Sequence, residues 1–444
     1  MQIKEYRLRD FINTDLKVFS NLDNIRSIAS IIDGLKDSQR KAVFAMINNG
    51  NSEIKVAQLG SYAAKETHYA HGEVSMCDTI INLAQNFPGS NNMNLFEPIG
   101  QFGSILSAEA SAPRYIYTKP SKHMRKLLRV EDDLILENGY VDGDKVEPVN
   151  YFPVLPLWLI NWTEGIGTGH AVKILPRNPK LIAQLMGKIV AGVTPQQRTI
   201  DEAMTPWFGT WKGVVKKGDN ESQWELHGVI ETINTTTLRI TELPVTYNID
   251  KYKALLIALM DDGIIKNYES NSSEEGYDIT ITVPRETGRK TNDELKTIFK
   301  LVKTITENVT LWDVNGNLTR YANAYEALKS FVEFRQTIYE KRRLATIASL
   351  VEKIKFAETK IYFISFWNTS LKDPHKKSRS AIEQELTPQV EPQYFDQLFA
   401  MQIGSLTMER VESLKAECEK LKSSLDEYQK ATPTGMYQKD LSDF

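Results

Sequence analysis

Apolar residues recur at helical spacing in three segments near the start of the chain, 37–47, Lys55–Glu66 and Ser75–Gln85. The second and third segments flank a short turn that contains glycine, Tyr69–Glu73. Two helices joined by such a turn are typical of a helix-turn-helix. We therefore expect a winged-helix, DNA-binding unit in this part of the chain.

Between about 205 and 290 apolar and polar residues alternate, which indicates strands. The alternation is clearest in Trp224–Ile233, Thr237–Val245 and Tyr277–Val283. Helical spacing returns around these segments, at 178–192, 249–261 and 292–304. The mixture predicts a second, α/β domain.

The last part of the chain favours two long helices. No proline or glycine occurs from Leu318 to Asp373, and a helix of about 45 residues there would reach roughly 65–70 Å. A second helix is indicated by an a/d seam at Val411, Leu414, Cys418, Leu421, Leu425 and Tyr428. The pair predicts an antiparallel coiled coil, with a small apolar knob formed by residues 370–405.

The knob region carries more aromatic side chains than a solvated tip needs: Phe363, Phe366, Trp367, Tyr394, Phe395 and Phe399. They could serve only as the core of the knob. We expect that some of them also form a dimer contact. After Pro433 the chain continues as a short polar tail, 434–444.

Composition narrows the class of protein. The 444 residues are 25% charged and 41% hydrophobic, with a net charge of −3, so no field of the whole protein attracts nucleic acid. Any DNA contact must come from a local patch. The two cysteines, Cys77 and Cys418, match no metal spacing and suggest a reducing, intracellular compartment. We expect no signal peptide and no membrane span.

The strongest local patch is the basic run Arg114–Arg129, which carries six lysines or arginines and no acidic residue. It follows a loop with Gly100, Gly103 and Pro113, residues that mark special backbone conformations. Tyr115 lies directly after Arg114. A phenol has a pKa near 10 and is a poor nucleophile in water, but cations that stabilise the phenolate make transesterification feasible. The alternative is an ordinary strand with a solvated basic face.

Ala112–Thr118 (Ala-Pro-Arg-Tyr-Ile-Tyr-Thr), with Gly89–Gly103 before it, resembles the breakage-reunion region of type IIA DNA topoisomerases. The amino-acid sequence of this stretch is closer to that of eukaryotic topoisomerase II than to that of gyrase A. The resemblance implies that Tyr115 becomes joined to a DNA 5′ phosphate, with Arg114 as its electrostatic helper. It implies that Tyr117 has a packing role.

Other stretches extend the resemblance. Arg26 begins a segment similar to the family's Arg…Asp-Gly-Leu-Lys…Gln-Arg-Lys signature, which implies that Arg26 reaches the active site. The same signature implies DNA backbone contacts by Lys36, Arg40 and Lys41, and the basic run adds the DNA-binding candidates Lys122 and Arg125.

The turn Tyr69–Glu73 resembles a family turn with two histidines, and His71 matches the last of them. Ala70 departs from the family pattern, so His68 is only an alternative. A histidine in a turn is more often a surface hydrogen-bonding residue than a catalyst.

Two glycine-containing stretches invite other interpretations. Glu164–Arg177 has neither the dinucleotide-binding nor the P-loop spacing, so we interpret it as a glycine turn that lets the backbone approach DNA. The resemblance implies that Ile174 wedges between base pairs, although Leu175 separates it from Pro176; a core role is the alternative. Asp142-Gly-Asp144 lacks the further oxygen ligands of a calcium loop and predicts a turn.

The resemblance implies an α+β multidomain fold. We expect a winged-helix DNA-cleavage domain over 1–155, an α/β tower domain over 156–317, and over 318–433 a long antiparallel coiled coil that ends in a dimer gate. The protein would be the homodimeric breakage-reunion subunit of an ATP-dependent type II topoisomerase, which passes one DNA duplex through another to relax or decatenate DNA.

The family places Mg²⁺ and ATP on an upstream region or on another polypeptide, a Toprim/ATPase subunit like gyrase B, so we expect a partner to supply both. A short subunit of this kind resembles the medium subunit of tailed-phage topoisomerases, which implies a viral protein that acts on DNA in the host cytoplasm. The alternatives are a non-catalytic DNA clamp or architectural protein, and a tyrosine recombinase, whose Arg/His arrangement is not seen.

Overall fold

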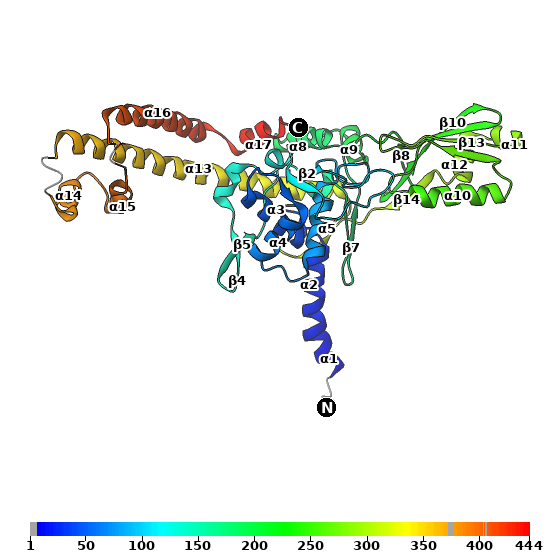
Figure 1. The fold of residues 1–444 in the computed structure, drawn as a ribbon, viewed down its shortest axis with the longest axis horizontal. Helices are drawn as coiled ribbons and strands as arrows, with labels where there is room; N and C mark the ends of the chain where they lie inside the picture. Colours follow the sequence, from blue (N-terminus) through cyan, green and yellow to red (C-terminus); the bar gives the residue numbers. More distant parts are fainter. Residues whose placement is uncertain (1–6, 372–376, 403, 405) are drawn as a thin grey trace. The chain divides into compact units, whose positions relative to one another are not determined.

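The computed structural model describes residues 7–371, 377–402, 404 and 406–444 (Figure 1). It separates into two compact units. The first takes in the chain up to Gln336 and the segment Tyr437–Phe444, and the second is Thr337–Met436. All the residues that the sequence assigns to catalysis or DNA binding lie in the first unit.

The first unit begins with a continuous helical segment that Figure 1 draws as α1 and α2. Its parts are α1 (Leu8–Phe11), a π-helical turn (Ile12–Leu16) and α2 (Lys17–Ser27). Three more helices follow, α3 (Asp37–Asn49), α4 (Val56–Glu66) and α5 (Glu73–Ala84), each close to its predicted range. They form because their periodic apolar residues, among them Val43, Leu59 and Ile80, are completely buried.

A three-stranded antiparallel sheet in the order β1-β3-β2 accompanies these helices: β1 (Ile54–Lys55), β2 (Phe96–Ile99) and β3 (Tyr117–Pro120). Short elements follow, namely α6 (Met124–Leu127), a 3-10 helix (Val130–Ile135), β4 (Asn138–Val141), β5 (Asp144–Pro148) and α7 (Leu157–Ile160). The predicted turn at Asp142 is confirmed, because β4 and β5 form a hairpin around Asp142 and Gly143, both with positive φ.

A second hairpin, β6 (Thr163–Ile166) and β7 (Ala171–Ile174), leads into α8 (Pro179–Val190) and α9 (Gln197–Met204). The predicted α/β region then appears as two antiparallel sheets, β14-β9-β8 and β10-β11-β13-β12. Their strands are β8 (Val214–Lys217), β9 (Gln223–His227), β10 (Val229–Asn234), β11 (Thr237–Glu242), β12 (Asn267–Ser270), β13 (Ile279–Thr282) and β14 (Val302–Thr306).

Three helices belong to this region: α10 (Ile249–Asp261), α11 (Arg285–Gly288) and α12 (Asn292–Ile298). Leu256 of α10 and Leu295 of α12 share one apolar cluster with Ile281 of β13, so these helices pack on the four-stranded sheet (Figure 1). The expected helix over 292–304 is too long, because Lys300 has a positive φ and Val302–Thr306 pairs with β9. The unit also contains the hairpin β15 (Thr310–Trp312) and β16 (Leu318–Arg320).

The 46-residue helix α13 (Ala324–Thr369) begins in the first unit and continues through the second, close to the length predicted from the missing prolines and glycines. At its start, Arg335 forms a buried ion pair with Asp132 (2.5 Å) and donates a hydrogen bond to the carbonyl of Pro153 (3.1 Å). This pair ties the first turns of α13 to the 3-10 helix of the same unit.

The second unit is built on α13 and α16 (Met408–Lys430), with α14 (Arg379–Leu386), a 3-10 turn (Pro392–Tyr394) and α15 (Phe395–Phe399) between them. Ile354 and Ala357 of α13 pack on Cys418 of α16, and further along α13 Phe363 packs with Leu414. Later residues of α13 therefore meet earlier residues of α16, so the two helices run antiparallel. The predicted aromatic residues form a common apolar cluster at this end.

The expectation of a polar tail after Pro433 is wrong. Residues Pro433–Leu441 form helix α17, in which Tyr437 is completely buried and donates a hydrogen bond to the carbonyl of Val154 (3.2 Å). Asp440 and Asp443 pair with Arg129. The end of the described chain is thus part of the first unit. None of the described helices is long and apolar enough to span a membrane.

Candidate functional site

Tyr115 lies in a turn immediately before β3, not on the strand itself. Its backbone N–H donates to the carbonyl of Ala112 (2.9 Å), which closes the turn. The side chain is 68% exposed, and the guanidinium of the exposed Arg114 lies 4.9 Å from the centre of its ring. The phenol is therefore presented to solvent beside a cation.

Tyr117 differs from Tyr115 in both position and contacts. It pairs with Ile99 and Lys55 within the sheet and is half-buried, and the ammonium of Lys55 lies 5.7 Å from its ring centre. The strand alternative for the two tyrosines is therefore wrong for Tyr115, and the packing role predicted for Tyr117 agrees with its position.

The loop before Tyr115 needs its two glycines. Gly100 and Gly103 both have positive φ, and a Cβ on Gly103 would lie 2.7 Å from the carbonyl oxygen of Ala108. The buried side-chain amide of Gln85 donates to the carbonyls of Phe102 (2.8 Å) and Ala108 (2.9 Å). These contacts position the loop, and the turn with Arg114 and Tyr115 follows it.

Several cations of the basic run are already paired with acidic residues, which its sequence alone did not indicate. Lys119 pairs with Glu97 (3.6 Å), Arg125 with Asp133 (3.6 Å) and Arg129 with Asp440 (3.6 Å) and Asp443. Of the predicted DNA-binding pair, Lys122 is exposed, whereas Arg125 is half-buried and already paired with an acid. Arg114, Lys122 and Lys126 are the exposed cations of the run. Since Lys126 donates to the carbonyl of Asp443 (3.5 Å), Arg114 and Lys122 are the best candidates for a phosphate contact.

The expectation that Arg40 and Lys41 are free DNA-contacting cations is corrected by their ion pairs. Arg40 is bound by both oxygens of the buried Asp33 (2.8 and 3.1 Å). Lys41 pairs with Glu147 (2.5 Å) and donates to the carbonyl of Thr67 (3.1 Å), and its side chain is 12% exposed. Both cations hold the interior of the unit together.

Lys36 is an intermediate case. Its ammonium donates to the backbone carbonyl of Glu164 (2.7 Å), and burial lowers its pKa even though the Glu164 carboxylate nearby acts in the opposite direction. The side chain is half-buried, so Lys36 joins α3 to the β6–β7 hairpin and stays accessible from one side.

Arg26 is exposed in the last turn of α2. This end of the helix packs closely on the β6–β7 hairpin, because a Cβ on Gly165 would lie 1.9 Å from the carbonyl oxygen of Ser27 and one on Gly167 would lie 2.2 Å from Asn24 Oδ1. The glycines of this stretch therefore allow close approach of α2, and the predicted approach of the hairpin backbone to DNA is untested. The sequence offered no signal for the α2 contact.

Ile174 is completely buried in β7, where it pairs with Thr163. The expectation that it is available to wedge between base pairs is thus not met in this conformation, and its alternative, a core role, describes its position. The aliphatic side chain that the hairpin exposes is Ile166, which is 80% accessible. Sequence alternation alone did not reveal which face of the hairpin is covered.

His71 is exposed in the turn before α5, with its ring 5.4 Å from that of Tyr69 in an edge-to-face arrangement. His68 instead lies 3.1 Å from the carboxylate of Asp144 at the start of β5. Of the two candidates, His71 is the one without an acidic partner in the described part of the chain. This fits the choice of His71 over His68, although its catalytic role stays a prediction.

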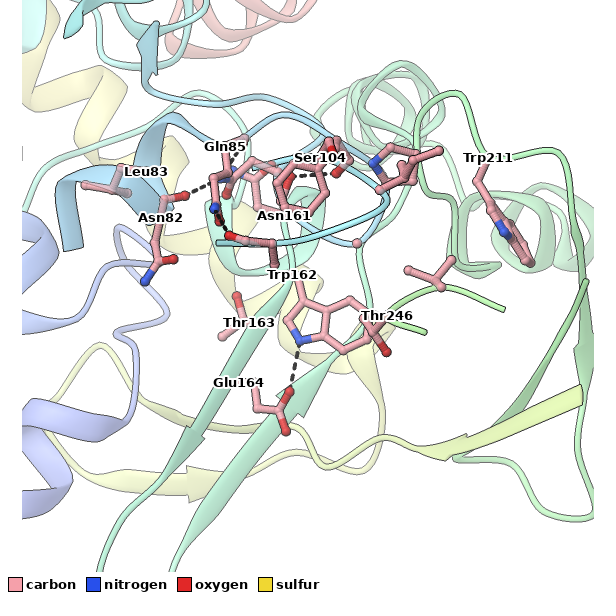
Figure 2. A pocket seen from close by; sticks show the side chains of 18 of the residues that line it. Asn82, Leu83, Gln85, Ser104, Asn161, Trp162, Thr163, Glu164, Trp211 and Thr246 are labelled. Atoms are coloured by element: carbon pink, nitrogen blue, oxygen red, sulfur yellow. Dashed lines mark hydrogen bonds between the residues drawn. The ribbon is translucent and has the colours of Figure 1, made fainter. Parts of the chain in front are cut away.

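A cavity of about 450 Å³, lined by both polar and apolar residues, lies beside these elements (Figure 2). Lys36, Gln85, Asn161, Glu164 and Trp211 are among the residues that line it. Figure 2 shows the indole N–H of Trp162 donating to Glu164, over a distance of 3.1 Å. The cavity joins residues that are far apart in the sequence, so no motif predicted it.

The residues present do not fit a magnesium site. Among the described residues, no three His, Cys, Asp or Glu side chains come together in a group that could hold a metal ion. Two acids that contact the basic run, Glu97 and Asp133, are paired with Lys119 and Arg125. No step of the chemistry is therefore assigned to a metal held by this chain.

Comparison with known proteins agrees with the sequence resemblance. Residues 26–442 match the family model that describes the A subunits of DNA gyrase and topoisomerase IV. DNA topoisomerase 2 of Plasmodium falciparum is 35% identical to the chain over 99% of its length, and the mitochondrial DNA topoisomerase 2 of Dictyostelium discoideum is 32% identical over 99%. The matches cover 34% and 35% of these relatives, so the chain spans about a third of their length.

A solved structure is similar throughout. The crystal structure of the Plasmodium falciparum topoisomerase II DNA-binding, cleavage and re-ligation domain superimposes with a TM-score of 0.91 at 34% identity, over 98% of this chain and 63% of that one. These relatives are eukaryotic, so the expected viral source gains no support from them and stays a prediction. Since the family model takes in nearly the whole chain, the protein belongs to the family of DNA gyrase/topoisomerase IV A subunits.

Proposed function

We propose that this chain is the DNA breakage-reunion part of a type II topoisomerase and that Tyr115 is its nucleophile. The observation that carries the proposal is the exposed phenol of Tyr115 in a turn beside the Arg114 guanidinium, in a chain of this family. The similarity to the Plasmodium falciparum cleavage domain supports the same role. A purely architectural DNA clamp is not favoured, because the relatives are named topoisomerases.

The proposed reaction is a reversible transesterification. The phenol oxygen of Tyr115 attacks the phosphorus of a DNA phosphodiester, the Tyr–O–P bond forms, and the bond from phosphorus to the 3′ oxygen breaks. The phenolic proton leaves to a base, for which His71 is the candidate, and the departing 3′ oxygen takes up a proton. Arg114 stabilises the negative charge on the phosphate, with Arg26 as a second candidate. The 5′-phosphotyrosine conserves the bond energy, so resealing requires no nucleotide.

The architecture proposed for this function divides the chain as the resemblance implies. Helices α3 to α5 with the sheet β1-β3-β2 would form the winged-helix domain, and the two sheets with α10 and α12 the tower domain. The antiparallel pair α13 and α16 would act as a coiled coil that ends in a dimer gate. The gate is supported by aromatic side chains at that end that are only partly buried, such as Trp367 and Phe399.

The proposed cycle needs a partner. Type II topoisomerases use Mg²⁺ and ATP, and the described residues contain no group of ligands for a metal ion. We place both cofactors on a Toprim/ATPase region, either a separate gyrase B-like subunit or a further part of a longer chain. The proposed substrate is double-stranded DNA, held by two copies of the chain so that each Tyr115 cuts one strand.

The test is covalent trapping. The chain is mixed with a Toprim/ATPase subunit of the family, Mg²⁺ and plasmid DNA, and the reaction is stopped with denaturant. We expect adducts on 5′ ends that disappear in Tyr115→Phe, because this change removes one exposed oxygen and leaves the ring and the fold intact. Tyr117→Phe is the matched control and should retain adducts, since Tyr117 packs within the sheet.

Two results would refute the assignment: adducts that survive in Tyr115→Phe, or a nucleotide mapped to Tyr117. DNA affinity should be unchanged in both variants. If the wild-type chain binds DNA but never forms an adduct with the partner present, the architectural alternative is correct.

A further inference from the structure

The loop 101–111, which leads into the turn with Tyr115, is closed by its own backbone. At its base the N–H of Ser111 donates to the carbonyl of Gln101 (3.0 Å), and at its tip the N–H of Ser104 donates to the carbonyl of Ser107 (2.7 Å). Ala112, whose carbonyl accepts the N–H of Tyr115, follows the base directly. Where the loop lies therefore affects where the proposed nucleophile lies.

The tip of this loop is bound to the sheet β10-β11-β13-β12. The hydroxyl of Tyr277 donates to the carbonyl of Ile105 (2.7 Å), and the side chains of Ile105 and Leu106 pack on the apolar cluster of that sheet. Tyr277 itself precedes β13 and belongs to the same cluster. Burial, together with the charge of Glu242, raises the pKa of Tyr277 to about 12, so the hydroxyl keeps its proton and can donate at neutral pH.

Packing alone does not fix the loop, because residues 104–108 border the cavity described above (Figure 2). A segment beside a cavity makes few van der Waals contacts on that side, so its hydrogen bonds have a larger share in fixing its position. Gln85 binds the loop to the end of α5, and Tyr277 binds it to the sheet. A third hydrogen bond, from Gln101 to Glu274 (3.1 Å), is exposed to solvent and contributes less.

We propose that Tyr277 is a positioning residue for the reaction at Tyr115: its hydroxyl fixes the tip of the loop 101–111 and thereby the turn that presents the phenol. The inference rests on the proposed function and adds to it a residue that touches neither DNA nor the nucleophile. It also makes the sheet β10-β11-β13-β12 a determinant of the geometry of DNA cleavage, because the loop is bound to this sheet at its tip and to α5 through Gln85.

The test variant is Tyr277→Phe, which removes one hydroxyl and leaves the ring in the apolar cluster. The matched control is Tyr252→Phe, because Tyr252 belongs to the same cluster and donates to the backbone carbonyl of Phe299 (2.9 Å), outside the loop. Each change deletes one hydrogen bond from a buried tyrosine to a backbone carbonyl, so both should lower the free energy of unfolding by a similar amount. A difference between the two variants in catalysis then measures positioning.

Adduct formation is followed in a single turnover at saturating DNA, with the Toprim/ATPase subunit and Mg²⁺ present. In Tyr277→Phe we expect the rate constant of adduct formation to fall about 10-fold, since misplacing a reacting group by about 1 Å can cost on the order of 100-fold. The Kd for DNA and the final amount of adduct should change by less than about twofold, because a displaced turn slows cutting and resealing alike. A variant that had only lost folded molecules would instead form less adduct at an unchanged rate.

Hydrogen exchange of peptides that cover residues 101–115 tests the anchor without DNA. The amides of Ser104, Ser111 and Tyr115 are hydrogen-bonded, so they exchange slowly only while the loop and the turn stay closed. Tyr277→Phe should raise the exchange rate of this segment about 10-fold, and Tyr252→Phe should leave it unchanged. The turn keeps its own contact with α4, where the N–H of Ala57 donates to the carbonyl of Pro113 (3.2 Å), so we expect a displaced turn and not an unfolded one.

Three results would overturn the positioning role: a wild-type rate of adduct formation in Tyr277→Phe, an equal loss of rate in Tyr252→Phe, or equal exchange of residues 101–115 in the two variants. Each of them leaves the proposed function intact, since the wild type still forms adducts on Tyr115. If the wild type forms no adduct with the partner present, the proposed function itself fails, and Tyr277 loses its catalytic role whatever the exchange rates show about the loop.

Discussion

Glu307 is the carboxylate on which the β6–β7 hairpin and the neighbouring sheet depend. Both of its oxygens bind the Arg177 guanidinium at 2.7 Å, and the two side chains are 7% and 2% exposed. The backbone N–H of Leu175 and the indole N–H of Trp224 also donate to Glu307, each at 2.8 Å. One carboxylate therefore joins the end of β7 to β9.

Replacing Glu307 with Gln should destabilise the first unit strongly. The change keeps the size of the side chain but leaves the buried Arg177 without a compensating charge, and breaking such a pair from one side costs about 3–5 kcal/mol. The matched control is Glu202→Gln, because Glu202 pairs with Arg198 (3.0 Å) on an exposed surface of α9. An exposed pair of this kind contributes about 0.3–0.5 kcal/mol.

The lowered pKa of Glu307 also predicts how the stability difference between wild type and Glu307→Gln depends on pH. Burial by itself raises the pKa of Glu307, but the charge of Arg177 and the hydrogen bonds from Arg177, Leu175 and Trp224 outweigh it, so the pKa lies below its usual value. A carboxylate with a lowered folded pKa stabilises the fold fully above its unfolded pKa of about 4.3, and this stabilisation is lost as the pH falls through the folded value. The difference between wild type and Glu307→Gln should therefore be largest near neutral pH and shrink in acid.

Urea unfolding of both variants, followed by circular dichroism at several pH values, measures these free energies. A loss below about 1 kcal/mol for Glu307→Gln at pH 7 would show that the ion pair is solvated, and would refute the reasoning. A loss that stays constant from pH 7 to pH 3 would show that the charge of Glu307 is not its cause.

Two further predictions follow from the site. Gly165→Ala places a Cβ where the carbonyl of Ser27 lies, so it should lower the free energy of unfolding in urea by about 1–3 kcal/mol. The control is Gly187→Ala in α8, where nothing lies within 4 Å of the added Cβ, and this change should be neutral or stabilising. Equal losses of stability in the two variants would contradict the α2–hairpin contact. Lys122→Ala removes one exposed cation of the basic run and should reduce the magnitude of the slope of log affinity for duplex DNA against log salt by about 0.9, measured by fluorescence anisotropy. The control is Arg198→Ala, which removes an exposed cation on α9 and should leave the slope unchanged. An unchanged slope in Lys122→Ala would mean that Lys122 faces away from DNA.

The periodicity of the sequence predicted those elements whose character is local. Helices α4, α5, α10 and α13 have nearly their predicted limits, because helical spacing and the absence of proline or glycine act within the segment itself. Helix α12 is shorter than expected, since the strand that replaces its predicted end is stabilised by pairing with β9, which lies far earlier in the chain. Helical spacing cannot reveal such a partner.

In the candidate site, too, the sequence predicted the features that are local and missed those that depend on distant residues. The Arg-Tyr pair, the glycine loop before it and the resemblance of both to the family were visible in the sequence, and the structure presents Tyr115 and Arg114 to solvent. The sequence did not reveal that Arg40 and Lys41 are bound by Asp33 and Glu147, because ion pairs depend on which acids the fold brings near.

By itself, then, the sequence determined the family, the main helices and strands, and the identity of the reactive tyrosine candidate, all of which depend on residue type and local order. Only the tertiary structure decided which charges are neutralised, that Ile174 is buried while Ile166 is exposed, and that the helix carrying Arg26 turns its apolar residues outward. The physical reason is that burial and charge pairing are properties of the space around a side chain, and that space is filled by residues far away in the sequence.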